Sequence, residues 1–298
     1  MDAVLKECTF WDRERLLTER NEGQAYYFAK TRHNGIGIFA KRRIRRGELI
    51  LVEAPLLTIS NDDKSKPEFP EKYIDKLDEN EKEVFYSLHT VGVKQSNIFE
   101  VNEFDLRKLG TGLFMKMSRI NHSCRPNSHY AWDPHRRLLT LYAQEDVEQD
   151  QEITVTYMDL RADWQARQAH LKNYFLFECK CELCVKKNGH ESNNRRNETM
   201  RLRNEYAQFK DGAPHNALVS LKTMLSLYRD ENMLYYASYV GEANEQILNL
   251  YLNRFGGQRY SYIRSLIADY ARYTLGNYTI CFGRERVDRD YAWIKSHL

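Results

Sequence analysis

The sequence predicts a mixed α+β protein in which a β-rich part is followed by an all-helical part. Residues 25–57 and 119–157 contain β-prone segments such as AYYFAK, ELILV and RLLTLYA, which are separated by glycine turns. Residues 73–118 place apolar side chains at helical spacing. Residues 200–298 hold several segments with one apolar face each, which is typical of packed helices.

These patterns divide the chain into four parts. Residues 1–24 carry an apolar face in a charged segment, which predicts a helix. A β-rich domain is expected over 25–160, with a helical insertion at about 60–117, and a short cysteine-bearing segment follows at 161–187. The polar stretch NGHESNNRRNETM at 188–200 is typical of a linker, and we expect a helical domain at 197–298.

Composition excludes several classes of protein. The 298 residues include 45 Lys and Arg against 42 Asp and Glu, so a net charge of +3 gives little attraction to nucleic acid, and direct binding is not expected. The basic run Lys41–Arg46 is interpreted as a solvated turn between strands. The sequence contains no apolar run of about 18 residues, so it predicts no membrane helix. The opening MDAVLKECTFWDRER lacks the apolar core of a signal peptide, so we expect an intracellular protein, nuclear or cytoplasmic.

Three cysteines fall within six residues, at Cys179, Cys181 and Cys184. Cysteines this close make poor disulfide partners, and a reducing compartment also favours metal binding. Thiolates at this spacing suit a structural zinc ion, which needs four ligands, so one ligand must come from elsewhere in the chain. The alternative is three reduced, partly buried thiols.

Two further segments have the composition of functional sites. GIGIFA at 35–40 fits a dinucleotide-binding glycine motif on paper, but a strand after Gly47 leaves too little room for the helix that this motif requires. A glycine turn that allows close approach of a ligand is the better interpretation. In NHSCRPN, a Cys124–His122 catalytic dyad is disfavoured because no orienting acid lies nearby, and Cys124 suits the fourth metal ligand better.

Taken together, the order and spacing of four motifs resemble the SET-domain protein lysine methyltransferases. The motifs are GIGIFA, SRINHSCRPN, QEITVTYMDL and FECKCELC, and they extend from about Gly35 to Cys184. The likeness is greatest to the subgroup with a split SET domain, a zinc-binding post-SET segment and a helical C-terminal region, the MYND-type and fungal proteins. No cysteine lies between Leu57 and Cys124, so the MYND zinc finger of that subgroup is missing.

The resemblance implies a fold, an activity and a set of site residues. It implies a SET β-fold with a helical insertion, a zinc-bound post-SET segment, and an all-α C-terminal domain. It implies transfer of a methyl group from S-adenosylmethionine to the lysine of a protein substrate, histone or not, by an enzyme that we expect to be a monomer. A non-catalytic interaction module that keeps the fold is the alternative.

By the same resemblance, each motif supplies particular residues. Tyr157 matches the catalytic tyrosine, and Cys124 matches the ligand that completes a zinc site with Cys179, Cys181 and Cys184. The residues implied to contact S-adenosylmethionine are Asn34, Gly35, Ile36, Gly37, Asn102, Ser118, Asn121, His122, Tyr157, Phe175 and Phe177. For Phe175 and Phe177, plain core packing is the alternative.

Overall fold

The structure is a computed structural model that describes residues 23–32, 35–66, 69–92, 94–134, 136–185, 189–209, 214–231 and 233. Most of the predicted N-terminal helix at 1–24, and residues 234–298 of the predicted helical domain, lie outside the described residues. The chain divides into two compact units. The first comprises residues 1–122, 126–155 and 171–177, and the second comprises residues 123–125, 156–170 and 178–298.

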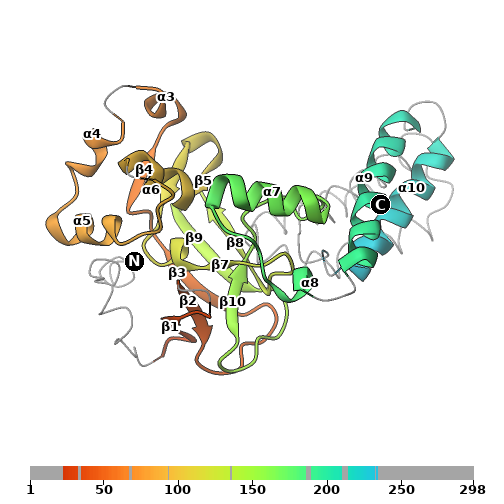
Figure 1. Cartoon of the computed structure of the whole chain (residues 1–298), viewed down its shortest axis with the longest axis horizontal. Helices are drawn as coiled ribbons and strands as arrows, with labels where there is room; N and C mark the ends of the chain where they lie inside the picture. The colour runs from red at the N-terminus through yellow and green to blue at the C-terminus, as the bar shows by residue number, and fades with distance from the viewer. Residues whose placement is uncertain are drawn as a thin grey trace, which may run out of the picture. The chain divides into compact units, whose positions relative to one another are not determined.

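The strands belong to the first unit (Figure 1) and form three small sheets. A four-stranded sheet has the order β1-β2-β10-β7, and two three-stranded sheets have the orders β3-β9-β8 and β4-β6-β5. The strands are β1 (Tyr26–Lys30), β2 (Ile36–Ala40), β3 (Leu49–Glu53), β4 (Leu57–Ile59), β5 (Glu103–Asp105), β6 (Thr111–Leu113), β7 (Asn121–His122), β8 (Ser128–Asp133), β9 (Leu138–Ala143) and β10 (Glu152–Val155).

Strand β10 is the element that organises the four-stranded sheet. It pairs antiparallel with β2, where Ile153 faces Ile38, and both side chains are fully buried. On its other edge it pairs parallel with β7, where Thr154 faces Asn121 and Val155 faces His122. Because both neighbours take their register from β10, the glycine turn that leads into β2 and the NHSC motif that begins in β7 are brought to one sheet.

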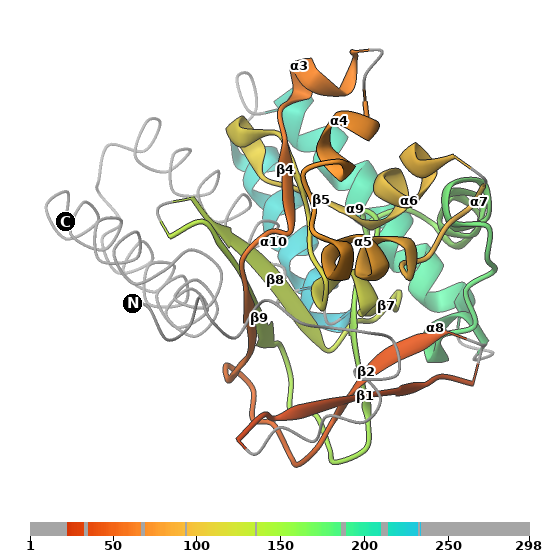
Figure 2. The same cartoon turned by 90° about the vertical axis from the view of Figure 1, so that its left-hand side faces the viewer.

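The insertion between the β segments forms a core of its own. Its helices are α3 (Asn61–Lys64), α4 (Glu71–Ile74), α5 (Glu79–Tyr86) and α6 (Gln95–Asn102), and they gather about β4 and β5 (Figure 2). Helix α5 begins at a capping box in which Asp78 and Glu81 each accept a bond from the other's backbone N–H. Phe85, Phe99 and Leu113 are buried in the shared core. The predicted helical insertion at 60–117 therefore also contains strands β5 and β6.

The second unit contains α8 (Glu182–Val185), α9 (Gly189–Phe209), α10 (Pro214–Asp230) and the first half of α7 (Trp164–Phe175). Helices α9 and α10 lie side by side (Figure 1). The predicted linker at 188–200 is wrong, because α9 covers it. Between residues 191 and 200 the buried side chains of that helix are the polar Ser192, Arg196 and Thr199, so the composition of this segment resembled that of an exposed one.

Candidate functional site

The two glycines of the GIGIFA motif have different surroundings. Among the described residues, a Cβ atom at Gly35 would meet only the Thr31 hydroxyl, 3.8 Å away. At Gly37 it would lie 2.6 Å from Oε1 of Glu152 and 2.8 Å from Nδ2 of Asn121, closer than real Cβ contacts allow. Gly37 is therefore required by side chains of the protein itself, whereas the space beside Gly35 is compatible with the close approach of a ligand.

Asn121 is held by the neighbouring strand β10 and by the start of β2, the strand on the other side of β10. Its Nδ2 donates to Oε1 of Glu152 at 2.7 Å and to the carbonyl oxygen of Ile36 at 3.4 Å. The amide group is thus fixed in orientation by β10 and β2, and the side chain is only half-buried. Gly37, Asn121, His122 and Glu152 are here called the Asn121 cluster.

The loop that follows Asn121 is anchored by a residue that sequence reasoning did not single out. Asn127 is buried, and its amide bonds the backbone of β10 on both sides of Ile153: Nδ2 donates to the carbonyl of Glu152 at 2.8 Å, and Oδ1 accepts from N–H of Thr154 at 2.8 Å. Side-chain amides that replace a missing strand partner hold such loops in place. The sequence signal that could have identified Asn127 is its place at the end of the polar run NHSCRPN.

Aromatic rings extend from the Asn121 cluster. The ring centroid of His122 lies 6.4 Å from that of Phe177, which in turn lies 6.4 Å from that of Phe175. All three side chains are half-buried, so the two phenylalanines are not plain core residues within the described structure. The structure thus brings Phe175 and Phe177 to the same part of the first unit as His122.

Asn102 and Ser118 also come together. The Ser118 hydroxyl donates to the carbonyl of Asn102 at 3.0 Å, and Nδ2 of the buried Asn102 donates to the carbonyls of His89 and Ile98. Asn102 is the last residue of α6, and the chain passes directly from it into β5. The bonds of Asn102 and Ser118 join chain segments within the first unit.

A buried carboxylate supports the turn that leads to Asn121. Glu53 on β3 is 3% exposed and accepts hydrogen bonds from N–H of Lys116 and of Met117, each at 2.9 Å. These bonds hold the start of a short 3-10 turn, Met117–Arg119, which lies against β2. Burial raises the pKa of Glu53, because a charged carboxylate loses its hydration there.

Tyr157 lies in the second unit, in a turn just after β10. The predicted strand at 152–157 ends at Val155. The Thr156 hydroxyl accepts from N–H of Met158 at 3.3 Å and donates to the carbonyl of Met158 at 2.8 Å, so the backbone around Tyr157 is tied into a tight turn. The tyrosine side chain is half-buried. Asn34 lies outside the described residues.

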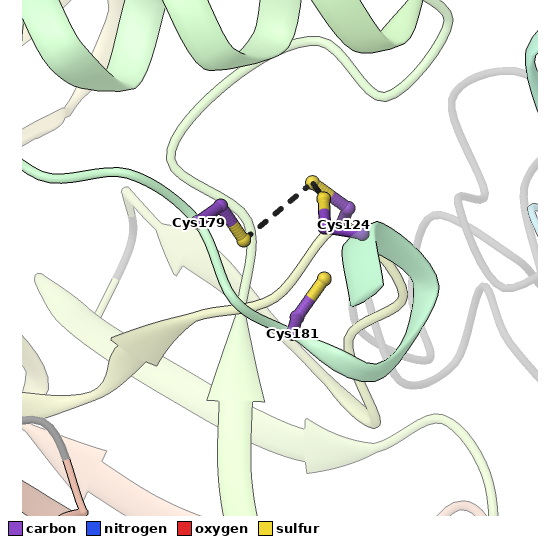
Figure 3. Close-up of side chains that lie close together, drawn as sticks. Cys124, Cys179 and Cys181 are labelled. Carbon is purple, nitrogen blue, oxygen red and sulfur yellow. Dashed lines mark hydrogen bonds between the residues drawn. The ribbon is translucent and has the colours of Figure 1, made fainter. Parts of the chain in front are cut away.

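The four predicted metal ligands converge. The sulfurs of Cys124, Cys179, Cys181 and Cys184 all lie within 4.8 Å of one another, and none of the four is in a disulfide. The Cys124 Sγ is 3.9 Å from that of Cys179 and 3.6 Å from that of Cys184. Figure 3 shows the sulfurs of Cys124, Cys179 and Cys181 turned toward a shared space. These residues are here called the cysteine cluster.

The spacing of the sulfurs fits a tetrahedral metal ion. Zinc–sulfur bonds of about 2.3 Å in a tetrahedron place sulfurs about 3.8 Å apart. Within the cluster, hydrogen bonding with Cys124 lowers the pKa of Cys181 and raises that of Cys179, because crowded thiols share protons and cannot all ionise without a cation. Four ionised thiols at these distances would repel one another, and a metal cation that thiolates bind would offset that repulsion, so the four residues could hold a metal ion.

Helix α7 supports the cysteine cluster from one side. Gln168 bonds both backbone groups of Cys179: its Oε1 accepts from the N–H at 2.9 Å, and its Nε2 donates to the carbonyl at 3.0 Å. Next to it, Nε of the buried Arg167 donates to Sγ of Cys124 at 3.3 Å. Sequence reasoning missed both residues, because a polar residue on a short helix gives no signal that it faces a metal site.

Residues 35–158 match the SET domain family, from Gly35 to the residue after Tyr157. The chain contains a SET domain. The mixed helix and strand architecture agrees with the predicted α+β class, and the recognition of a SET-type lysine methyltransferase sequence is confirmed. The SET domain includes every member of the Asn121 cluster, and also Cys124 and Tyr157.

Three curated relatives show how far the similarity extends beyond the SET domain. The chain is 32% identical to the histone-lysine N-methyltransferase set5 of Schizosaccharomyces pombe, over 55% of this chain and 51% of that protein. It is 34% identical to the histone-lysine N-methyltransferase ASHR1 of Arabidopsis thaliana, over 30% and 18%. It is 34% identical to the histone-lysine N-methyltransferase SMYD3 of Homo sapiens, over 30% and 20%.

The chain spans about half the length of the S. pombe relative and about a fifth of the other two. The similarity to the relatives therefore concerns parts of these proteins rather than whole proteins. In the part of the chain that the structure describes, no helix is both long enough and apolar enough to cross a membrane.

Proposed function

We propose that the chain is a protein-lysine N-methyltransferase that uses S-adenosylmethionine and acts on a neutral lysine amine of a protein, histone or not. The observation that carries the proposal is the register of β10 in the SET domain, which places Gly37, Glu152 and Asn121 side by side. The relatives named as histone-lysine N-methyltransferases support the reaction class. We propose that the enzyme works inside the cell, in the nucleus or cytoplasm, as a monomer.

The residues of the first unit suit S-adenosylmethionine. The space beside Gly35 can admit a ligand's polar end next to backbone groups, and the half-buried rings of His122 and Phe177 can pack on an adenine. We propose that the binding residues are Asn34, Gly35, Ile36, Gly37, Asn121, His122, Phe175 and Phe177. Asn102 and Ser118 join them as residues that shape the wall of the site, since their side chains bond neighbouring carbonyls.

When bound, S-adenosylmethionine supplies the methyl group as an electrophile. The task of the chain is then to present an uncharged lysine in line with it. A free lysine has a pKa of about 10.4, and a dry aromatic environment lowers that pKa because it disfavours the ammonium form. Alignment of two well-oriented reactants is worth up to roughly 7–11 kcal/mol, so a strong acid or base at the reacting centre is not needed.

Tyr157 is our candidate for the residue that orients the amine. A phenol can hold an amine by hydrogen bonding without adding a negative charge. A negative charge at that place would favour the ammonium form of the lysine. The turn built by Thr156 and Met158 fixes the backbone on both sides of Tyr157, so the side chain projects from a fixed position on the chain. We propose that this tyrosine is the catalytic residue.

We further propose that the cysteine cluster holds one structural zinc ion. Four thiolates leave no open coordination position, so the metal would have a structural role rather than a catalytic one. Cys179 follows Phe177 by two residues, and metal binding therefore fixes the chain that carries the proposed adenine-packing ring. In this view the metal supports cofactor binding through the connection between these residues.

Incubation of the purified chain with labelled S-adenosylmethionine and a peptide array tests the proposal. We expect label on lysine peptides, and loss of about 100-fold in turnover for Tyr157→Phe with little change in cofactor affinity, because the lost hydroxyl acts in alignment. Peptide mapping by mass spectrometry must locate the methyl group on a lysine. Label on another acceptor would contradict the lysine assignment.

The other candidate, a non-catalytic interaction module, makes the opposite prediction. It keeps the fold and the metal but binds no S-adenosylmethionine. The half-buried, oriented amide of Asn121 favours the enzyme, since a module has no use for a polar group fixed against the carbonyl of Ile36, the residue after Gly35. A folded, zinc-loaded chain that binds no cofactor in calorimetry would favour the module.

A further inference from the structure

Two arginines are buried beside the cysteine cluster. Arg167 on α7 is 1% exposed and Arg196 on α9 is fully buried. Arginine stays protonated in proteins, so both positive charges are held away from water. A buried charge is tolerated only when opposite charge and hydrogen-bond acceptors surround it. The acceptors of these two guanidinium groups therefore indicate what the arginines are for.

Arg167 directs its side chain at a metal-ligand candidate. Its Nε donates to Sγ of Cys124 at 3.3 Å, and its Nη1 donates to the carbonyl of Ala162 at 2.5 Å. An N–H donor at a sulfur favours the thiolate over the thiol and withdraws charge from it. Groups that bond metal ligands in this way tune the affinity of the site.

Arg196 holds the backbone of the same ligand. Its Nη2 donates to the carbonyl of Cys124 at 3.2 Å, and its Nη1 donates to the carbonyl of Leu160. Its Nε donates to Oε2 of Glu231 at 3.0 Å, at the end of α10. One side chain on α9 thus joins the Cys124 loop, the segment after Tyr157 and α10.

Three arginines and one carboxylate meet in the described contacts around Cys124. Glu231 supplies one negative charge, and Arg195 also donates to it, through Nε to Oε1 at 2.6 Å. Within these contacts, Arg167 and Arg196 therefore bring an excess of positive charge to Cys124. A dication bound by four thiolates carries two net negative charges, which would offset that excess.

We propose that Arg167 and Arg196 are positioning residues of the metal site. Arg167 donates to the metal-bound thiolate of Cys124 and offsets its charge, and Arg196 fixes the Cys124 backbone and ties it to α9 and α10. This rests on the zinc site of the proposed function. By this proposal, the polar segment of α9 helps the protein to retain the metal.

The test measures zinc release from the purified, zinc-loaded full chain to a chelator, followed with a metal-sensitive dye. Arg167→Leu removes the donor, and zinc release should be about 10–100-fold faster. Arg167→Lys keeps a positive charge without the fork of donors and should give an intermediate rate. Arg196→Met should also accelerate release. Arg201→Leu is the matched control, because it breaks a surface ion pair on the same helix.

A second readout separates an effect on the thiolate from general loosening. In cobalt-substituted protein, loss of the N–H donor should shift the sulfur-to-cobalt charge-transfer band of Arg167→Leu to lower energy, because the thiolate is then less stabilised. Arg196→Met should leave that band in place, since Arg196 bonds the backbone carbonyl of Cys124 and not its sulfur. Release and band both unchanged in Arg167→Leu would overturn the proposal. If that variant does not fold, Arg167→Lys decides by the same two criteria.

Metal content of the wild-type chain separates this inference from the proposed function. Absence of zinc in the folded protein would overturn both the zinc site and the role proposed for Arg167 and Arg196. Zinc with no methyl transfer would contradict the enzyme alone, and the release experiment would still test the arginines. Normal activity with release rates equal in wild type and Arg167→Leu would overturn only the arginine assignment.

Discussion

The cysteine cluster and the Asn121 cluster differ in where their parts come from. The cysteine cluster takes three of its ligands from the six residues 179–184, and only Cys124 is distant. The Asn121 cluster takes its members from three strands, β2, β7 and β10, which are separated by long stretches of chain. The first is therefore a product of local spacing, and the second is a product of sheet register. A change of one residue should act differently in the two places.

Removal of a metal ligand should have the largest effect. We expect Cys179→Ser to abolish zinc binding and to destabilise the second unit strongly, because structural zinc sites contribute on the order of 10 kcal/mol to folding. Metal analysis and thermal unfolding would measure this. Lys180→Ala, an exposed neighbour between two ligands, should change neither. Full zinc content in Cys179→Ser would show that the local spacing does not build the site.

Substitutions of Gly35 and Gly37 should distinguish the approach of a ligand from the packing of the Asn121 cluster. Gly37→Ala places a methyl group against Glu152 and Asn121, and it should lower the free energy of unfolding by about 1–3 kcal/mol, as overpacking does. Gly35→Ala meets no such obstacle. It should leave thermal stability unchanged while weakening binding of S-adenosylmethionine. Equal stability loss in both variants would contradict the difference between the two positions.

Glu53 offers a test of the support beneath Asn121. Glu53→Ala leaves two buried N–H groups without their acceptor and should cost about 2–4 kcal/mol of stability. Glu53→Gln keeps one acceptor oxygen and should cost less. Chemical denaturation gives both values. The zinc content should be unchanged in each variant, so loss of zinc on substitution of Glu53 would show that the two clusters are not separate.

Acid should lower the stability of the first unit through His129, whose ring stacks on that of Tyr130 in β8. Burial lowers the pKa of His129 to about 4 from an ordinary value of 6.5. The unfolded chain therefore binds a proton that the folded chain excludes, and the free energy of unfolding falls as the pH drops from about 6.5 toward 4. We expect this term to reach about 1–3 kcal/mol. His129→Phe should flatten that part of the pH profile, and an unaltered slope would contradict the assignment.

Different parts of this structure could be predicted to different degrees. The three-cysteine segment, the glycine turn and the NHSC motif were all visible in the sequence, because their chemistry depends on residue type and spacing. Their mutual arrangement was not, since it depends on the pairing of β10 with β2 and β7. The resemblance predicted that Cys124 joins the three clustered cysteines, and the structure places the four sulfurs within 4.8 Å of one another. The reason for Gly37 came from the geometry alone.

The polar segment at 188–200 shows why composition misleads. Ser192, Arg196 and Thr199 are buried in α9, where polar groups bond one another and the backbone of distant segments. A linker and a helix with a polar buried face have the same average hydropathy. Only partners far away in the sequence, such as Glu231 and Cys124, distinguish the two, and no local pattern indicates them.

The most direct test of the account is a calorimetric titration of S-adenosylmethionine into the folded, zinc-loaded chain. The account predicts one binding site per chain, weakened by about 10–100-fold in Asn121→Ala, where an oriented amide is lost from the Asn121 cluster. Lys180→Ala should bind as the wild type does. Absence of heat for the wild-type chain, or affinity unchanged in Asn121→Ala, would contradict the central claim that this cluster holds the methyl donor.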